Sequence, residues 1–249
     1  MSLTGTARCA LLDNLRGLTL VSMTAYHACW DMVYIFGHDW AWYASAGAYW
    51  WQQSICWTFI LLSGFCWPLG RRPLRRGVEV SAGGGLVTAA TVLFMPENRV
   101  LFGVLTLLGA SMLLLIPLDK LFQKISPLAG VFGAFALFLL TRNVNRGTLG
   151  FETWRLASLP RGLYRSLPTA FLGFPPESFW STDYFSLLPW FFLFLTGYFL
   201  HRLRRGKPLP AGRSWPLLGF LGRHSLVIYL LHQPVVYAVL TLWETAAGR

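Results

Sequence analysis

Charged residues are scarce in this sequence of 249 residues: Asp, Glu, Lys and Arg make up 12%, whereas 55% of the residues are hydrophobic. Soluble domains carry about 25% charged residues, so this chain has too few polar side chains to cover a globular surface. The hydrophobic residues also occur in long runs, and a run of about 18 or more is typical of a helix that crosses a membrane. The composition therefore excludes an ordinary soluble domain and predicts an integral membrane protein.

Cysteine is also rare, and its placement excludes two further classes of protein. The sequence has four cysteines, none in a CxxC or Cys/His pattern with metal-ligand spacing. Three of them lie in or beside apolar runs, where cysteine behaves as a small hydrophobic residue. We therefore expect no disulfide framework and no metal site. The three glycines at 83–85 are not followed by the GK[ST] of a phosphate-binding loop, and they indicate close helix packing.

Acidic residues are fewer than basic ones, 10 against 21, which gives a formal net charge of +11. In a soluble protein this excess would suggest binding to nucleic acid. Here the cations cluster beside hydrophobic segments, as expected for loops that face an anionic cytoplasmic leaflet. No basic and aromatic module of the nucleic-acid-binding kind interrupts the membrane pattern. We therefore expect membrane lipids as partners, and no nucleic acid.

Seven hydrophobic segments predict an all-α fold, a polytopic membrane helical bundle that forms a single domain over residues 1–249. The predicted spans are 14–36, 48–69, 78–95, 100–118, 127–141, 184–203 and 223–243. The stretch 142–183 is too interrupted to span, and we expect it to lie in the membrane interface or to re-enter the membrane.

The distribution of Lys and Arg among the loops predicts a cytoplasmic N-terminus. With this orientation the cytoplasmic side receives Arg8 and the arginines of 71–76, among others. The opposite side receives Arg99, Arg249 and five arginines between 142 and 165. The arginines of this long outer loop oppose the usual bias, although long loops count less.

The first predicted span carries ionisable residues that a simple anchor would not need. Asp13, Arg16, His27 and Asp31 lie on or beside one helix, with His38 at its far end. Arg16 and His27 are 11 residues apart. This spacing places them on almost the same face of a helix, about 16 Å apart along its axis. Asp31 is one turn beyond His27. Ionisable groups inside a bilayer usually mark a functional site, so we predict a functional polar stripe; the alternative is hydrogen bonding between helices.

This polar stripe fits the chemistry of acyl transfer. A histidine held by a carboxylate has a fixed tautomer and a more basic second nitrogen. His27 beside Asp31 can therefore take the proton of an attacking hydroxyl or amine, or accept the acyl group itself. Arg16, near the cytoplasmic end, suits the phosphates of coenzyme A. We predict catalytic roles for His27 and Asp31, and a donor-binding role for Arg16.

The same residues resemble those of known membrane acyltransferases. LDNLRG (12–17), with Arg16 followed after ten residues by His27, resembles the R-x10-H signature of the acyltransferase-three type. FILLSGF and the following RRPLRR resemble second-helix features of that group. More of the chain resembles the short bacterial form of the heparan-alpha-glucosaminide N-acetyltransferase catalytic-domain family. The segments that carry this second resemblance are 15–37, 99–117, 181–200 and 221–236.

The resemblance implies transfer of an acyl group, typically acetyl, from cytoplasmic acyl-CoA to a sugar amine or hydroxyl at a bacterial inner membrane. Acetyl-CoA or another acyl-CoA would be the co-substrate, with no metal, and a carbohydrate or glycolipid would be the acceptor. A homodimer partner is also a candidate. We expect no counterpart of the long lumenal domain of the eukaryotic relatives, and therefore no activity on heparan sulfate.

The resemblance leaves two histidines open for the catalytic role. His27 matches the R-x10-H signature, whereas the catalytic histidine of the acetyltransferase family falls where His38 stands. We favour His27, because it lies deeper in the predicted span and has Asp31 one turn away. His38, at the outer mouth, would suit a base on the acceptor side.

Five other residues are candidates for the site. Arg72 and Arg75 can neutralise coenzyme A phosphates, although retention of positive charge on the cytoplasmic side would also explain them. His232 and Gln233 precede a proline in the last span, where they form either a repaired helix break or a pocket wall. Asp183 precedes the sixth span, and it either caps that helix or contacts the acceptor.

Two other classes of membrane protein would also need buried polar residues. A transporter or lipid flippase usually shows repeated halves and broken helices, and we find no convincing repeat. A membrane b-type cytochrome would use His27, His38 and His232 as haem ligands, but no two histidines on one helix have the spacing of a ligand pair. The acyltransferase is therefore the predicted function.

Overall fold

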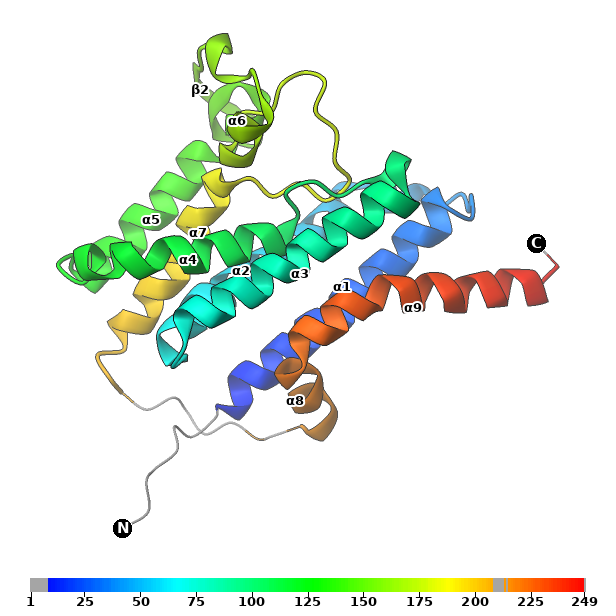
Figure 1. The fold of residues 1–249 in the computed structure, drawn as a ribbon, viewed down its shortest axis with the longest axis horizontal. Helices are drawn as coiled ribbons and strands as arrows, with labels where there is room; N and C mark the ends of the chain where they lie inside the picture. The colour runs from blue at the N-terminus through cyan, green and yellow to red at the C-terminus, as the bar shows by residue number, and fades with distance from the viewer. Residues whose placement is uncertain (1–8, 208–212, 214, 249) are drawn as a thin grey trace. The chain divides into compact units, whose positions relative to one another are not determined.

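The computed structural model describes residues 9–207, 213 and 215–248, so Arg8 and Arg249 lie outside the described residues. The described chain is mostly helical, with 73% helix and 4% strand, which confirms the predicted helical class (Figure 1). Its α-helices are α1 (Ala10–Tyr34), α2 (Ala46–Cys66), α3 (Pro73–Phe94), α4 (Val104–Phe122), α5 (Pro127–Thr141), α6 (Leu167–Leu172), α7 (Leu187–Leu203), α8 (Pro216–Arg223) and α9 (Ser225–Ala246).

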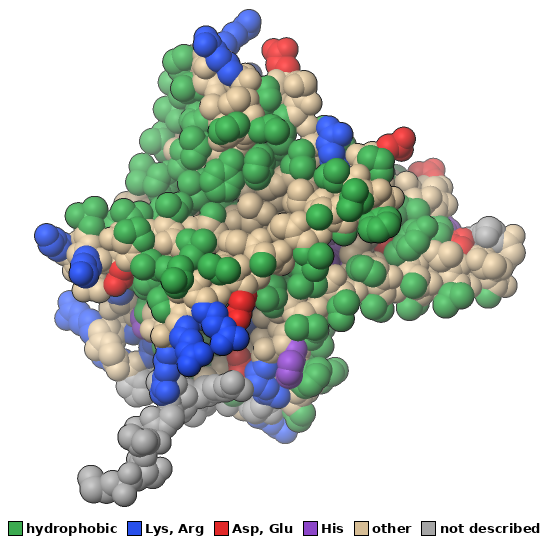
Figure 2. Space-filling view, in the orientation of Figure 1, with side chains coloured by type: hydrophobic (Ala, Val, Ile, Leu, Met, Phe, Trp, Pro, Cys, Tyr) green, Lys and Arg blue, Asp and Glu red, His purple; other side chains and the backbone are tan. Residues whose placement is uncertain are grey.

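Each of the seven predicted spans coincides with one of these helices, namely α1 to α5, α7 and α9. Four described helices are long and apolar enough to cross a membrane: Pro73–Phe94, Val104–Phe122, Pro127–Arg146 and Ser225–Ala246; α7 is a shorter apolar helix. Hydrophobic side chains cover much of the visible face of α3 and of α9 (Figure 2). An integral membrane protein is therefore confirmed, and the number of seven spans stays a prediction.

The stretch 142–183 contains a β-hairpin, which is an exception to the all-α prediction. β1 (Thr148–Phe151) pairs antiparallel with β2 (Trp154–Ser158). The side chain of Asn143 donates to the carbonyl oxygens of Glu152 and Trp154, at 3.0 and 3.1 Å, and so closes the hairpin. The side chains of β2 are exposed along the whole strand, and the pairing with β1 is irregular between Leu149 and Gly150. The hairpin therefore has no regular alternation of buried and exposed residues by which the sequence could predict it.

The chain divides into two compact units. Unit 1 combines residues 1–59 with 207–249, and unit 2 comprises residues 60–206. The expectation of a single domain over 1–249 stays a prediction.

In unit 2, α3 and α4 pack closely through glycine. A methyl group added to Gly84 of α3 would lie 2.7 Å from the backbone nitrogen of Thr106, and one added to Gly109 of α4 would lie 2.6 Å from that of Ser81. Neighbouring Gly85, in contrast, faces open space. The close packing predicted from the three glycines at 83–85 is therefore confirmed for one face of α3.

In unit 1, α1 and α9 lie side by side and run in the same direction (Figure 1). The direction follows from their contacts, since His27 of α1 meets His232 of α9 and the later His38 meets the later Glu244. In the sequence, α1 and α9 are separated by all of unit 2. In the structure they pack against each other within unit 1.

The short helix α8 holds the start of this pair through two glycines. A methyl group added to Gly17 of α1 would lie 2.1 Å from the carbonyl oxygen of Leu218, and one added to Gly222 of α8 would lie 1.9 Å from that of Asp13. No side chain fits at either position, so α1 and α8 touch backbone to backbone. Because α9 begins two residues after α8, this contact fixes where α9 starts beside α1.

Candidate functional site

A buried carboxyl group is the deepest polar feature of the α1–α9 pair. Asp31 is fully buried, and its Oδ1 accepts a hydrogen bond from Nε2 of Gln233 at 2.6 Å. Among the described residues, the second carboxyl oxygen of Asp31 and Oε1 of Gln233 have no hydrogen-bond partner. Two buried acceptor atoms are therefore left without a donor from the protein.

Two histidine rings meet between the same two helices, from residues close in sequence to Asp31 and Gln233. The ring centroids of His27 and His232 are 4.9 Å apart, with an angle of 61° between the planes. Nδ1 of His232 lies 2.5 Å from the carbonyl oxygen of Tyr229, and a carbonyl can only accept, so Nδ1 carries the proton. In the neutral ring Nε2 of His232 is then an acceptor, and it too is buried without a partner in the described part of the chain.

Near the other end of both helices, His38 forms a pair with Glu244. Nε2 of His38 lies 2.8 Å from Oε1 of Glu244, whose side chain is buried. Since the carboxylate accepts, Nε2 of His38 donates, which leaves Nδ1 of the neutral ring as the basic nitrogen. Within the described ranges this is the only ion pair between a histidine and an acidic residue.

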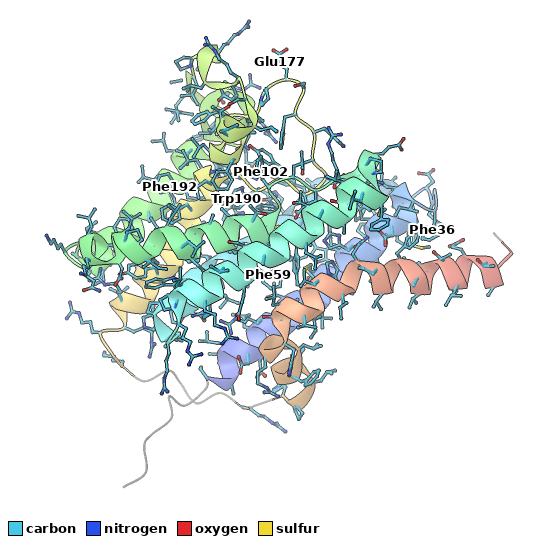
Figure 3. All side chains as sticks on the ribbon, viewed as in Figure 1. Phe36, Phe59, Phe102, Glu177, Trp190 and Phe192 are labelled. Carbon is cyan, nitrogen blue, oxygen red and sulfur yellow. The ribbon has the colours of Figure 1, made fainter. Side chains whose placement is uncertain are left out.

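A cavity of about 470 Å³ opens at this pair. It is lined by Phe36, Gly37, His38, Thr241, Glu244 and Thr245. Phe36, labelled in Figure 3, stacks on Tyr237 of α9 with ring centroids 6.1 Å apart. The pair of His38 and Glu244 is therefore positioned to meet a small molecule.

A turn, not a helix, places His38 in this cavity. α1 ends at Tyr34, so the helix does not continue to His38 as the polar stripe would require. Gly37 has a φ of +73°, a left-handed conformation that glycine adopts without strain. The backbone N–H of His38 then donates to the carbonyl oxygen of Met32 at 2.9 Å. The chain folds back over the end of α1, and the ring of His38 reaches α9.

The predicted partnership of His27 and Asp31 is not found in the structure. Neither residue bonds to the other; Asp31 accepts from Gln233, and His27 contacts His232. The two residues are one helical turn apart on α1, but the contacts of both are with residues of the facing helix α9. His27, Asp31, His232 and Gln233 are nevertheless brought together between α1 and α9, as residues of one polar cluster.

Arg16 lies at the other end of α1. Its guanidinium is 3.6 Å from the carboxylate of Asp13, one turn earlier, and its side chain is partly exposed. Asn14 of the same turn donates to the carbonyl oxygen of Arg213 at 2.7 Å. These contacts hold the start of α1 and leave Arg16 at the opposite end of the helix from His38.

The remaining predicted site residues belong to unit 2. Arg75 forms an exposed ion pair with Glu79 at 2.7 Å, and Arg72 is exposed at the start of α3. Asp183 caps a different helix from the predicted one: its Oδ2 accepts from the backbone N–H of Val104 at 3.3 Å, at the start of α4. The donor-binding and acceptor-binding roles of these residues stay predictions.

The environment of Asp183 makes the stability of the fold depend on pH. Burial raises the pKa of Asp183 from 3.8 to about 6. Between pH 4 and pH 6 the folded protein therefore keeps a proton on Asp183 that the unfolded chain has lost. The free energy of unfolding is largest at low pH and falls as the pH rises from about 4 to about 6. We expect Asp183→Asn to raise the thermal unfolding midpoint at pH 7.5, because the amide can still accept from Val104 without carrying a buried charge. A thermal unfolding series across pH measures this effect.

Glu177→Gln is the matched control for this prediction, because Glu177 is an exposed acid of the same loop. It should leave the pH dependence of the wild-type protein unchanged. A wild-type midpoint that does not change between pH 4 and 6, or an Asp183→Asn protein that is less stable at pH 7.5, would contradict the assignment.

Glu244 is the site residue that the sequence analysis missed. It is the only acidic residue of α9, and it lies near the end of that helix, whereas His232 lies in its first half. A lone acid in an apolar helix is itself a signal of a site. Its partner His38 follows α1 in the chain, so only the parallel arrangement of α1 and α9 reveals the pair.

Comparison with known proteins identifies the family of this chain. The family model "Heparan-alpha-glucosaminide N-acetyltransferase, catalytic" matches residues 8–234, a range that contains His27, Asp31, His38, His232 and Gln233. Neither the curated proteins nor the solved structures contain a significant match. A match over nearly the whole chain decides the family. The chain therefore belongs to the heparan-alpha-glucosaminide N-acetyltransferase catalytic-domain family and is an acetyltransferase-type membrane enzyme.

Proposed function

We propose that this protein transfers an acyl group, typically acetyl, from acyl-CoA to the amine or hydroxyl of a sugar at the membrane. The observation that supports this most strongly is the pair of His38 and Glu244 at a cavity of about 470 Å³. A histidine oriented by a buried carboxylate, with its second nitrogen available to a ligand, is the arrangement that general base catalysis requires.

The role of His38 in this reaction depends on which of its ring nitrogens carries the proton. Glu244 holds Nε2–H of His38, so Nδ1 takes the proton of the acceptor's hydroxyl or amine as its oxygen or nitrogen attacks the thioester carbonyl. The new bond to the acyl carbon forms, the carbon–sulfur bond breaks, and the thiolate of coenzyme A leaves. The proton on Nδ1 then passes to that thiolate, which returns His38 to its neutral state.

The buried polar cluster supplies a second argument for an acceptor with hydroxyl or amine groups. The unpartnered atoms of Asp31, His232 and Gln233 are all hydrogen-bond acceptors when the carboxyl group is ionised. Buried acceptors without donors are costly, and a sugar offers donors in number. His27, which faces this cluster, is the rival for the catalytic role, and variants of the two histidines distinguish the two assignments.

The donor would approach from the cytoplasmic end. Arg16 stands at the start of α1, far from His38, and Arg72 and Arg75 lie near the start of α3. Guanidinium groups suit the phosphates of coenzyme A. This proposal includes a cytoplasmic N-terminus and a bacterial inner membrane as the location, since most cations flank the ends of the spans on that side.

The parallel contact of α1 and α9 supports seven spans. If both helices cross the membrane in the same direction, the chain between them must cross it an odd number of times. The five helices α2, α3, α4, α5 and α7 satisfy this condition, whereas four or six crossings would make α1 and α9 antiparallel.

Purified protein in nanodiscs, mixed with radiolabelled acetyl-CoA and a panel of amino sugars and glycolipids, tests the proposed function. The expected result is release of free coenzyme A that depends on the acceptor, together with label on that acceptor. Intact mass measurement after acetyl-CoA alone shows whether a histidine becomes acetylated, which separates a covalent route from direct transfer. Binding of acetyl-CoA without transfer to any sugar of the panel would count against the proposed function.

A further inference from the structure

A second cavity lies in unit 2, and the acyl-transfer proposal makes no use of it. Its volume is about 270 Å³. Three segments form its walls: the connection that leads into α4, the start of α6, and the loop at 176–180. Because all three walls belong to unit 2, the cavity is defined by one compact part of the chain.

Two arginines line this cavity without an acidic partner. Arg99 comes from the connection before α4, and Arg165 from the residue before the Ser166 cap of α6. Among the described residues, neither guanidinium has a hydrogen bond or an ion pair. The acids nearest in sequence, Glu97 and Glu177, do not line the cavity, and the side chain of Glu177 points away from its loop (Figure 3). The cavity therefore carries uncompensated positive charge.

The walls that carry the two arginines are held in place by hydrogen bonds. The backbone N–H and the hydroxyl of Thr182 donate to the carbonyl oxygen of Arg99, at 3.2 and 3.3 Å. Ser181 accepts from the backbone N–H of Leu101 at 2.9 Å and donates to its carbonyl at 3.0 Å. Ser166 forms a capping box with Thr169 at the start of α6. These contacts organise the cavity before any ligand arrives.

The cation excess of the surrounding loop also needs an explanation. The stretch 142–165 contains five arginines and one acidic residue, Glu152. Arg142 has a structural role, since it lies 3.5 Å from Glu152 and 4.8 Å from the ring centroid of Trp190. On the side of the membrane opposite the cytoplasm such charge runs against the usual bias. Within the described residues, no hydrogen bond or ion pair explains Arg165.

We propose that this cavity binds an anionic oxyacid group, a phosphate or a carboxylate. Two guanidinium groups present planar sets of donors that match the oxygens of such a group. Ser166 and Ser178 add hydroxyl groups to the lining, and Phe179 and Trp180 offer apolar surface to the rest of the ligand. The ligand is either the headgroup of an anionic phospholipid or a free phosphorylated or acidic sugar. This site stands independently of the acyl-transfer proposal.

Binding measurements on the whole protein test the site. The protein is placed in phosphatidylcholine nanodiscs, and calorimetry compares glucose 1-phosphate with glucose. Retention of phosphatidylglycerol in native mass spectra tests the lipid source. We expect one of the two anions to bind, and Arg99→Gln and Arg165→Gln each to weaken that binding by about tenfold, as the loss of a charged hydrogen bond predicts. Added salt should weaken it further.

Arg155→Gln is the matched control, because Arg155 is exposed on β2 and does not line the cavity. It removes the same charge from the same loop and should bind the anion as the wild-type protein does. Thermal unfolding of each variant verifies that it folds. The site is overturned if neither anion binds better than its uncharged analogue, or if Arg155→Gln weakens binding as much as the two cavity variants. If the two cavity variants lose binding of glucose 1-phosphate, the ligand of the cavity is a free sugar phosphate. If they lose retention of phosphatidylglycerol, the ligand is a lipid headgroup.

Discussion

His38→Ala is expected to lower the kcat of acetyl transfer by about 10²–10⁴-fold, the contribution that a positioned general base makes. The variant removes an imidazole that lies at the cavity and is held there by the carboxylate of Glu244. The KM for acetyl-CoA should change little, because the ring acts on the acceptor's proton. Steady-state release of coenzyme A, measured with saturating acceptor, gives both constants.

Three further variants make this test specific. Glu244→Gln keeps the shape of the positioning residue but removes its charge, so it should lower kcat by a smaller factor than His38→Ala. His224→Ala removes an exposed histidine whose ring contacts Phe220 of α8, and it should retain full activity. If His38→Ala retains wild-type kcat while His27→Ala loses it, the base is His27 and the assignment to His38 is wrong.

Gly222→Ala is expected to destabilise the protein by about 1–3 kcal/mol, the usual cost of overpacking. Alanine normally favours a helix over glycine by up to about 1 kcal/mol, so helix propensity alone predicts the opposite sign. The added methyl group would lie 1.9 Å from the backbone oxygen of Asp13, and no change of rotamer can relieve that contact. The unfolding midpoint of the variant, measured in one detergent, should therefore fall.

Gly133→Ala serves as the control for this prediction. Gly133 also lies within a helix, α5, but a methyl group there meets nothing within 4 Å. It should be neutral or slightly stabilising. Equal midpoints for the two variants would mean that α8 does not touch α1 through its backbone. A Gly222→Ala protein that is stable but inactive would show that the cost is met by a shift of α9 and its site residues.

The helices could be predicted from the sequence because hydrophobic length is the strongest signal that a membrane protein carries. All seven segments coincide with helices, and 127–141 matches α5 at both ends. The boundary at the last span is less accurate, since the predicted segment 223–243 runs through the break at His224 that separates α8 from α9. The short hairpin and α6 were missed because local turns and caps, and not a long apolar run, define them.

The members of the site could be predicted in part, but their partnerships could not. Buried ionisable residues identify themselves by their cost in an apolar segment, which is why His27, Asp31 and His232 were found. Sequence spacing paired Asp31 with His27, whereas the structure pairs it with Gln233. Contacts between helices depend on which faces meet and in which direction the helices run, and a single sequence contains neither. Glu244 was missed for the same reason.

The division of unit 1 between the two ends of the chain has a consequence for biosynthesis. The ribosome makes α1 and its Asp31 early, and it makes α9, with Gln233 and Glu244, only after all of unit 2. Until then the nascent chain holds a carboxyl group in an apolar helix with no Gln233 to bond it. A chain that stops before α9 therefore lacks the partners of both Asp31 and His38, and its site is incomplete. Activity can appear only after α9 has been made.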